Sequence, residues 1–152
     1  MKLGANLTWL FTELPFLDRP AAAAGAGFDA AEVLFPYDTP AEALRDAMTE
    51  AGLALTLINT PLCDTKGRAA IPGEQAAFCR DFETAAGYAR TAGAGFVHVM
   101  SGITEASEAR ETLVGNLRRA AREAPDLMLS IEPLNPNDMP GYFLHDFHLA
   151  AS

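Results

Sequence analysis

The chain of 152 residues has few basic residues and lacks long apolar runs. Its eleven Lys and Arg do not cluster, and twenty Asp and Glu bring the formal net charge to −9. A nucleic-acid surface needs clustered cations that displace counterions, so we expect no nucleic-acid partner. No apolar run approaches the roughly 18 residues of a membrane span, and the first residues lack the apolar stretch and cleavage site of a signal peptide. We therefore expect no membrane partner and a cytoplasmic location.

Cysteine is scarce as well, and a common nucleotide-binding motif is absent. Cys63 and Cys79 lie sixteen positions apart, without a CxxC pair or a neighbouring histidine. We expect two reduced thiols, with a disulfide or a metal role as the alternative. No GxGxxG loop follows the first apolar run, and the glycine-rich segment AGAGFD (24–29) comes after a helical stretch, where it ends a helix. Its position disfavours a dinucleotide-binding protein.

Five short apolar runs, typical of buried strands, alternate with helical stretches along the chain. The strands are expected at 2–7, 30–35, 53–60, 96–100 and 127–132, and the helices at 14–27 with a kink near Pro20, at 41–51 between a Thr39-Pro40 start and Gly52, at 73–92, at 107–123 and from 147 onward. Strict alternation predicts a single α/β domain over 1–152, with a parallel sheet and right-handed crossovers. An open doubly wound sheet and a (β/α) barrel of the TIM type both fit this pattern.

Polar side chains stand near the C-terminal ends of four of these strands. Side chains alternate between two faces along a strand, and in each case one face stays apolar while the other gains the polar group. Leu55 and Leu57 would share the inner face with Asn59, and Met100 and Met128 would also lie there. In a barrel, the strand ends converge on one mouth, where active sites are built. The residues expected there are Asn6, Asn59, His98 and Glu132, with Glu32 as a partner for an interior polar group.

Glu132 differs from the other polar residues because a carboxylate at the end of a buried strand is costly unless it is paired or binds a metal. No Lys or Arg follows position 122. We therefore expect a functional role for Glu132. Ordinary structural roles remain open for the others: a buried asparagine can satisfy loop backbone, and a strand histidine such as His98 can be a hydrogen-bonded core residue.

Four segments carry a resemblance to a known family. They are ANLTWLFTELPFLDR (5–19), FPYDTPAEAL (35–44), HVMSG (98–102) and, most specifically, IEPLNPNDMPGYFL (131–144). Together they resemble the hydroxypyruvate isomerase family, which belongs to the xylose-isomerase-like TIM barrels, as do sugar epimerases and endonuclease IV. The similarity runs along essentially the whole chain.

The resemblance implies a set of roles for individual residues. Glu132 would be a divalent-metal ligand and one of two acid/base carboxylates, and His98 a catalytic residue that faces the substrate. Asn6, Phe11 and Asn59 would line the substrate-binding mouth. The implied cofactor of the full-length protein is a divalent metal, Mg²⁺ or Mn²⁺. The implied reaction is an aldose–ketose type isomerisation of a small oxo-acid, hydroxypyruvate to tartronate semialdehyde, by proton transfer between carboxylates.

The chain departs from this family in one respect. A barrel of eight strands needs about 250 residues, whereas five strands are predicted here, so we expect a partial barrel that ends after strand five. The second catalytic carboxylate and three metal ligands would come from strands six to eight. We then expect the chain alone to be inactive as an isomerase. It should also have two open sheet edges, which a second copy in a homo-oligomer, a partner chain or the rest of a longer chain would cover. The alternatives are a 2-oxo-tetronate isomerase or a sugar epimerase on the same scaffold, or an inactive partial barrel that binds a partner.

Overall fold

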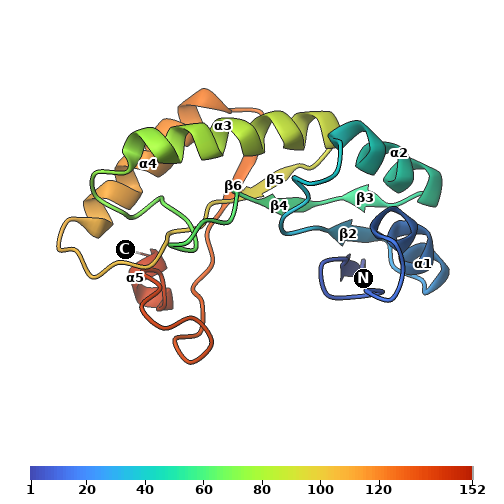
Figure 1. Ribbon diagram of the computed structural model, residues 1–152, viewed down its shortest axis with the longest axis horizontal. Coiled ribbons are helices and arrows are strands. Elements are labelled where there is room, and N and C mark those ends of the chain that lie inside the picture. Colours follow the sequence, from blue (N-terminus) through green and yellow to red (C-terminus); the bar gives the residue numbers. More distant parts are fainter. Residues whose placement is uncertain (152) are drawn as a thin grey trace.

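A parallel, curved sheet runs through the middle of the computed structural model, which describes residues 1–151 (Figure 1). Ser152, the last residue of the expected fifth helix, lies outside the described residues. The strands are β1 (Gly4–Asn6), β2 (Ala30–Glu32), β3 (Ala54–Leu55), β4 (Leu57–Asn59), β5 (Phe96–His98) and β6 (Met128–Ser130). They pair in parallel in the orders β1-β2-β3 and β4-β5-β6.

The two groups of strands form one continuous sheet, because β3 and β4 are successive parts of one strand. The Thr56 N–H donates to the Ala31 carbonyl (2.8 Å), and the Thr56 carbonyl accepts from the Phe96 N–H (2.9 Å). The Val33 N–H also donates to the Leu57 carbonyl (3.1 Å). The five expected strand segments are thus confirmed, with the third interrupted at Thr56.

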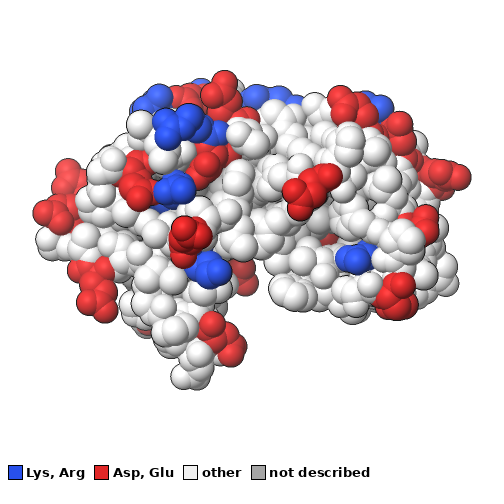
Figure 2. All heavy atoms as spheres, viewed as in Figure 1, with Lys and Arg blue, Asp and Glu red and all other residues white. Residues whose placement is uncertain are grey.

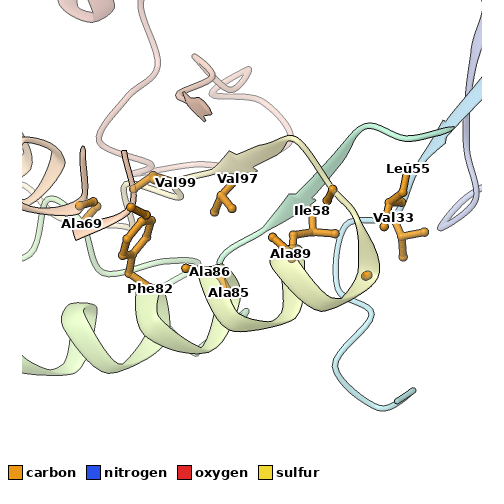
Figure 3. Close-up of a cluster of buried hydrophobic side chains, with 14 of the residues drawn as sticks. Val33, Leu55, Ile58, Ala69, Phe82, Ala85, Ala86, Ala89, Val97 and Val99 are labelled. Carbon is orange, nitrogen blue, oxygen red and sulfur yellow. The ribbon is translucent and has the colours of Figure 1, made fainter. Parts of the chain in front are cut away.

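The interruption at Thr56 changes which face the strand residues occupy. Leu55 pairs with Ala31 and Ile58 pairs with Val97, yet both Leu55 and Ile58 lie in the core beneath the helices (Figure 3). Residues 55 and 58 would lie on opposite faces of a regular strand, so the alternation shifts by one position, as it does at a β-bulge. The expectation that Leu55 shares the inner face with Leu57 and Asn59 is therefore wrong.

Helices cover one side of the sheet, except for the last helix, which lies apart from them near the C-terminus (Figure 1). After the 3₁₀ turn η1 (Phe16–Asp18) come α1 (Arg19–Gly25), α2 (Ala41–Ala51), α3 (Gln75–Ala92), α4 (Ala109–Glu123) and α5 (Phe147–Ala151). The expected break near Pro20 is the junction between η1 and α1. The Thr39 side chain makes no capping hydrogen bond to α2, contrary to expectation, whereas Gly52 ends that helix with a φ of 69°.

The core lies between this helical layer and the sheet. The alanine-rich face of α3, which includes Ala85 and Ala89, is fully buried against Ile58 and Val97 (Figure 3). Small alanine side chains let the helix approach the sheet closely, while each buried Val or Ile contributes roughly 1.5–3 kcal/mol through removal of apolar surface from water. Helix α3 packs on β4 and β5, and α4 packs on β6.

The opposite, inner face of the sheet is partly open. Met128 is 60% exposed and Phe96 is 38% exposed. Met100, which was also predicted on this face, is buried, because the loop after β4 lies over it and the Ala69 N–H donates to the Met100 carbonyl (3.2 Å). Among residues 1–151, β1 pairs only with β2 and β6 only with β5, so both predicted edges are present.

None of the helices within residues 1–151 combines the length and the apolar character needed to cross a membrane.

Candidate functional site

Three loops interlock where the strands end, and they set the positions of the candidate residues. Gly67, in the loop after β4, bridges to Ser101 after β5, and Ile103 bridges to Tyr142 in the loop after β6. A side chain at Gly67 would place its Cβ 2.4 Å from the Met100 carbonyl oxygen, and its φ of 113° is unfavourable for other residues. Only glycine allows these two loops to approach so closely.

Ser101 ties the three loops together. Its N–H donates to the Tyr142 hydroxyl (2.8 Å), and its carbonyl accepts from the Ala70 N–H (2.7 Å). Its hydroxyl accepts a further hydrogen bond from the Leu144 N–H (3.2 Å). Burial of Tyr142 among these groups raises the pKa of its phenol. The segment after β6 is therefore fixed against the end of β5.

His98 and Asn59 form the best-defined polar contact on the inner face. They are register partners on β5 and β4, and His98 Nδ1 lies 3.1 Å from Asn59 Oδ1. Asn59 Nδ2 lies 3.8 Å from Met100 Sδ, and the Tyr37 hydroxyl donates to the Asn59 carbonyl. His98 is only 4% exposed, and this burial lowers the pKa of its imidazole to about 4. The ring is therefore neutral at pH 7, and Asn59 determines its orientation.

Two polar atoms near this contact have no hydrogen-bond partner among residues 1–151. They are His98 Nε2 and the hydroxyl oxygen of Ser130, both buried. Ser130 is the register partner of His98 on β6. An unsatisfied buried polar group costs about 1–3 kcal/mol, so the pair calls for an explanation. Sequence reasoning passed over Ser130, although its position two residues before Glu132 places it on the same face.

Glu132 lies two residues beyond the end of β6, and its side chain is exposed. The expectation of a buried carboxylate is therefore wrong: β6 ends at Ser130, earlier than predicted. The charge of Glu132 contributes to the raised pKa of Tyr142, which indicates that these side chains lie near each other. Ser130 is the register partner of His98, so Glu132 comes two residues beyond the position that lies opposite His98 in the sheet. An exposed carboxylate here is free to bind a ligand or accept a proton.

The remaining candidates lie on the β1 side of the sheet. Asn6 Nδ2 donates to Glu32 Oε1 (2.7 Å), and Asn6 Oδ1 accepts from the Thr8 N–H (3.0 Å). The interpretation of Glu32 as a partner for an interior polar group is thus confirmed. Phe11 is half-buried in the loop after β1 and has a φ of 60°, which is unusual for a bulky residue. The structure brings Asn59 and His98 together, and it pairs Asn6 with Glu32.

The described residues do not by themselves form a metal site. Within residues 1–151, no three His, Cys, Asp or Glu side chains are grouped so that they could hold a metal ion. A hard divalent cation needs about six oxygen ligands, and Glu132 offers one carboxylate. Cys63 and Cys79 are free and half-buried. The Cys63 sulfur accepts from the Gly67 N–H (3.4 Å).

A parallel β/α sheet that gathers polar residues at its strand ends is typical of TIM-barrel proteins. The chain belongs to the xylose isomerase-like TIM barrel family, whose model matches residues 20–151. It is 40% identical to the 2-oxo-tetronate isomerase of Haemophilus influenzae, over 94% of this chain and 59% of that protein. It is 38% identical to the hydroxypyruvate isomerase of Escherichia coli, over 95% of this chain and 60% of that protein.

A solved structure agrees with this assignment. The crystal structure of an AP endonuclease, family 2, from Brucella melitensis has a TM-score of 0.89 and 40% identity, over 95% of this chain and 60% of that one. The resemblance to the hydroxypyruvate isomerase family is thus confirmed. The chain spans about three fifths of the length of these relatives.

Proposed function

We propose that this chain is the strand 1–5 part of an isomerase that acts on a small hydroxylated oxo-acid. The proposed reaction interconverts hydroxypyruvate and tartronate semialdehyde, and the related four-carbon reaction of a 2-oxo-tetronate isomerase is the second candidate. The relatives with these two names, at 38% and 40% identity, support the class of reaction. The observation that carries the proposal is the arrangement of His98 and Glu132. The neutral ring of His98 is held by Asn59, and the exposed carboxylate of Glu132 comes two residues after Ser130, the register partner of His98.

In this proposal the residues have distinct roles. Glu132 is the acid/base carboxylate that takes the α-proton of the substrate, a role that requires an accessible carboxylate. His98 is uncharged at pH 7 and contacts the substrate as a hydrogen-bonding group. Asn59 holds the ring of His98, while Asn6 and Phe11 line the β1 side of the mouth.

The proposal includes a divalent cation, Mg²⁺ or Mn²⁺, in the complete enzyme. Glu132 would be one of its ligands, and the others would lie outside this sequence, because within residues 1–151 no three His, Cys, Asp or Glu side chains are grouped so that they could hold a metal ion. The same reasoning applies to the fold. Further strands would pair with the open edges of β1 and β6 and cover Phe96 and Met128.

Two other activities have less support. The solved relative is named an AP endonuclease, but a DNA-binding surface needs clustered cations. Figure 2 shows acidic and basic side chains interspersed over one face of the molecule, and the net charge is −9. An inactive barrel that only binds a partner would have no need of an exposed Glu132 beside a neutral His98.

Turnover by the full-length protein tests the proposal. Hydroxypyruvate and 2-oxo-tetronate are incubated separately with the protein and Mg²⁺ or Mn²⁺, and the products are followed by NMR. We expect conversion of at least one, and loss of conversion in Glu132→Gln but not in the control Glu50→Gln, an exposed residue of α2. If neither compound is converted, the proposed function is wrong.

A further inference from the structure

The inner face contains two buried polar atoms that find no hydrogen-bond partner in the described part of the chain. They are His98 Nε2 and Ser130 Oγ, on the adjacent strands β5 and β6. Their residues are register partners, so both side chains belong to the same level of the sheet. Glu132 follows two residues after Ser130. The two unpartnered atoms therefore belong to the strand end that leads directly to the proposed acid/base residue.

The contact with Asn59 determines what His98 Nε2 can bind. Asn59 Nδ2 is directed at the Met100 sulfur, a weak acceptor, so the oxygen of the amide faces His98 Nδ1. An amide oxygen only accepts hydrogen bonds, and Nδ1 must carry the proton. In a neutral imidazole the other nitrogen then has a lone pair and no hydrogen. His98 Nε2 is consequently an acceptor that needs a donor.

Ser130 completes the chemical requirement of the site. A serine hydroxyl both donates and accepts, and it turns about a single side-chain torsion. Ser130 as a residue is half-buried while its oxygen is covered, and its hydroxyl can turn to meet a donor or an acceptor that reaches this level of the sheet. A ligand group that satisfies both atoms must donate to His98 Nε2 and pair with Ser130. A carboxylate or a ketone oxygen cannot donate, whereas a hydroxyl group can do both.

We propose that His98 Nε2 and Ser130 Oγ together bind one hydroxyl group of the ligand. The ligand O–H donates to His98 Nε2, and its oxygen accepts from the Ser130 hydroxyl. Ser130 is then a specificity-determining residue, and Asn59 is a positioning residue that fixes the tautomer of His98. The inference rests on the proposed function and deepens it: it assigns recognition of the substrate hydroxyl to His98 and Ser130, so that analogues without this hydroxyl bind less tightly.

Comparing hydroxypyruvate with pyruvate, which lacks only the hydroxyl, tests this inference by binding. The full-length protein is labelled with ¹⁵N-histidine, and the Nε2 resonance of His98 is followed during titration with each compound. Turnover does not interfere, because hydroxypyruvate and tartronate semialdehyde each carry one hydroxyl. We expect a non-protonated Nε2 in the free protein at pH 7, a shift of Nε2 with hydroxypyruvate only, and at least tenfold tighter binding of hydroxypyruvate.

The variants separate the role of Ser130 from general damage to the site. Ser130→Ala should reduce the preference for hydroxypyruvate about tenfold and leave the affinity for pyruvate unchanged, whereas Ser130→Thr, which keeps a hydroxyl, should retain the preference. A protonated Nε2, equal binding of both compounds by the wild type, or an unchanged preference in Ser130→Ala would overturn the inference. If hydroxypyruvate binds without shifting the Nε2 resonance, a water and not the ligand donates to His98, and the inference is also overturned. If neither compound binds, the proposed function itself fails.

Discussion

Lowering the pH should destabilise the folded protein through His98. The imidazole is buried and neutral in the folded state, with its pKa lowered from 6.5 to about 4. In the unfolded chain the same group takes up a proton below about pH 6.5. Between these values the unfolded state binds more protons, so the free energy of unfolding falls as the pH falls.

The magnitude follows from the size of the shift. One pKa unit corresponds to about 1.36 kcal/mol, so protonation of His98 in the unfolded chain should cost the folded state about 2.5 kcal/mol by pH 4.5. The loss begins near pH 6.5 and is complete below about pH 4, because there the folded protein also binds the proton. It is a large fraction of the 5–15 kcal/mol that typically separates folded from unfolded proteins.

Urea unfolding of the full-length protein measures this effect. The comparison is between the wild type and His98→Gln, which removes the titrating ring and keeps a side-chain amide that can bond to Asn59. The substitution lowers stability at pH 7, but we expect its destabilising effect to shrink by about 2.5 kcal/mol at pH 4.5. The carboxylates are the same in both proteins, so their contribution to the pH dependence cancels when the free energies of unfolding of the wild type and His98→Gln are subtracted. If the two proteins lose stability in parallel from pH 7 to 4.5, the account of His98 as a buried neutral ring is refuted.

Three further predictions concern the loops, the site and the sheet edges. Gly67→Ala should lower the free energy of unfolding by about 2 kcal/mol or more, because the added Cβ would meet the Met100 carbonyl. The control Gly115→Ala, in open space on α4, should raise the free energy of unfolding by about 0.5–1 kcal/mol. Equal effects of the two substitutions in urea unfolding would contradict the loop packing. Glu132→Gln should lower kcat of the full-length enzyme about 10²–10⁴-fold with an unchanged circular dichroism spectrum, and activity within tenfold of wild type would count against its role. The 152-residue chain alone should elute from size exclusion as oligomers or aggregates, because β1 and β6 are open edges; a monodisperse monomer with cooperative thermal unfolding would show that these edges need no cover.

Much of the fold follows from the spacing of apolar residues. The five strand segments, all five helix positions and the parallel order of the sheet agree with the alternation of apolar runs and helical stretches, because each pattern reflects burial on one face. One exception is Leu55, which lies on the helix-covered face and not on the inner face. The bulge at Thr56 breaks the alternation of side chains between β3 and β4, so Leu55 faces the opposite side from the one that counting back from Asn59 predicts. Bulges depend on pairing with neighbouring strands rather than on local sequence.

The candidate site was predictable in part. The inner-face placement of Asn59 and His98, and the pairing of Asn6 with Glu32, follow from strand alternation. The exposure of Glu132 does not, because the point at which a strand ends depends on what packs against it. Ser130 went unnoticed because a serine on a strand is ordinary in sequence, and its unpartnered hydroxyl is visible only in the structure.

Hydrogen exchange at the substrate carbon tests the central claim most directly. The full-length protein is incubated with hydroxypyruvate in D₂O, with Mg²⁺ or Mn²⁺ present, and deuterium at the carbon that loses its proton is followed by NMR. The account predicts rapid incorporation by the wild type and by Glu50→Gln, and loss of incorporation in Glu132→Gln, because Glu132 takes that proton. Incorporation at the wild-type rate in Glu132→Gln would contradict the account.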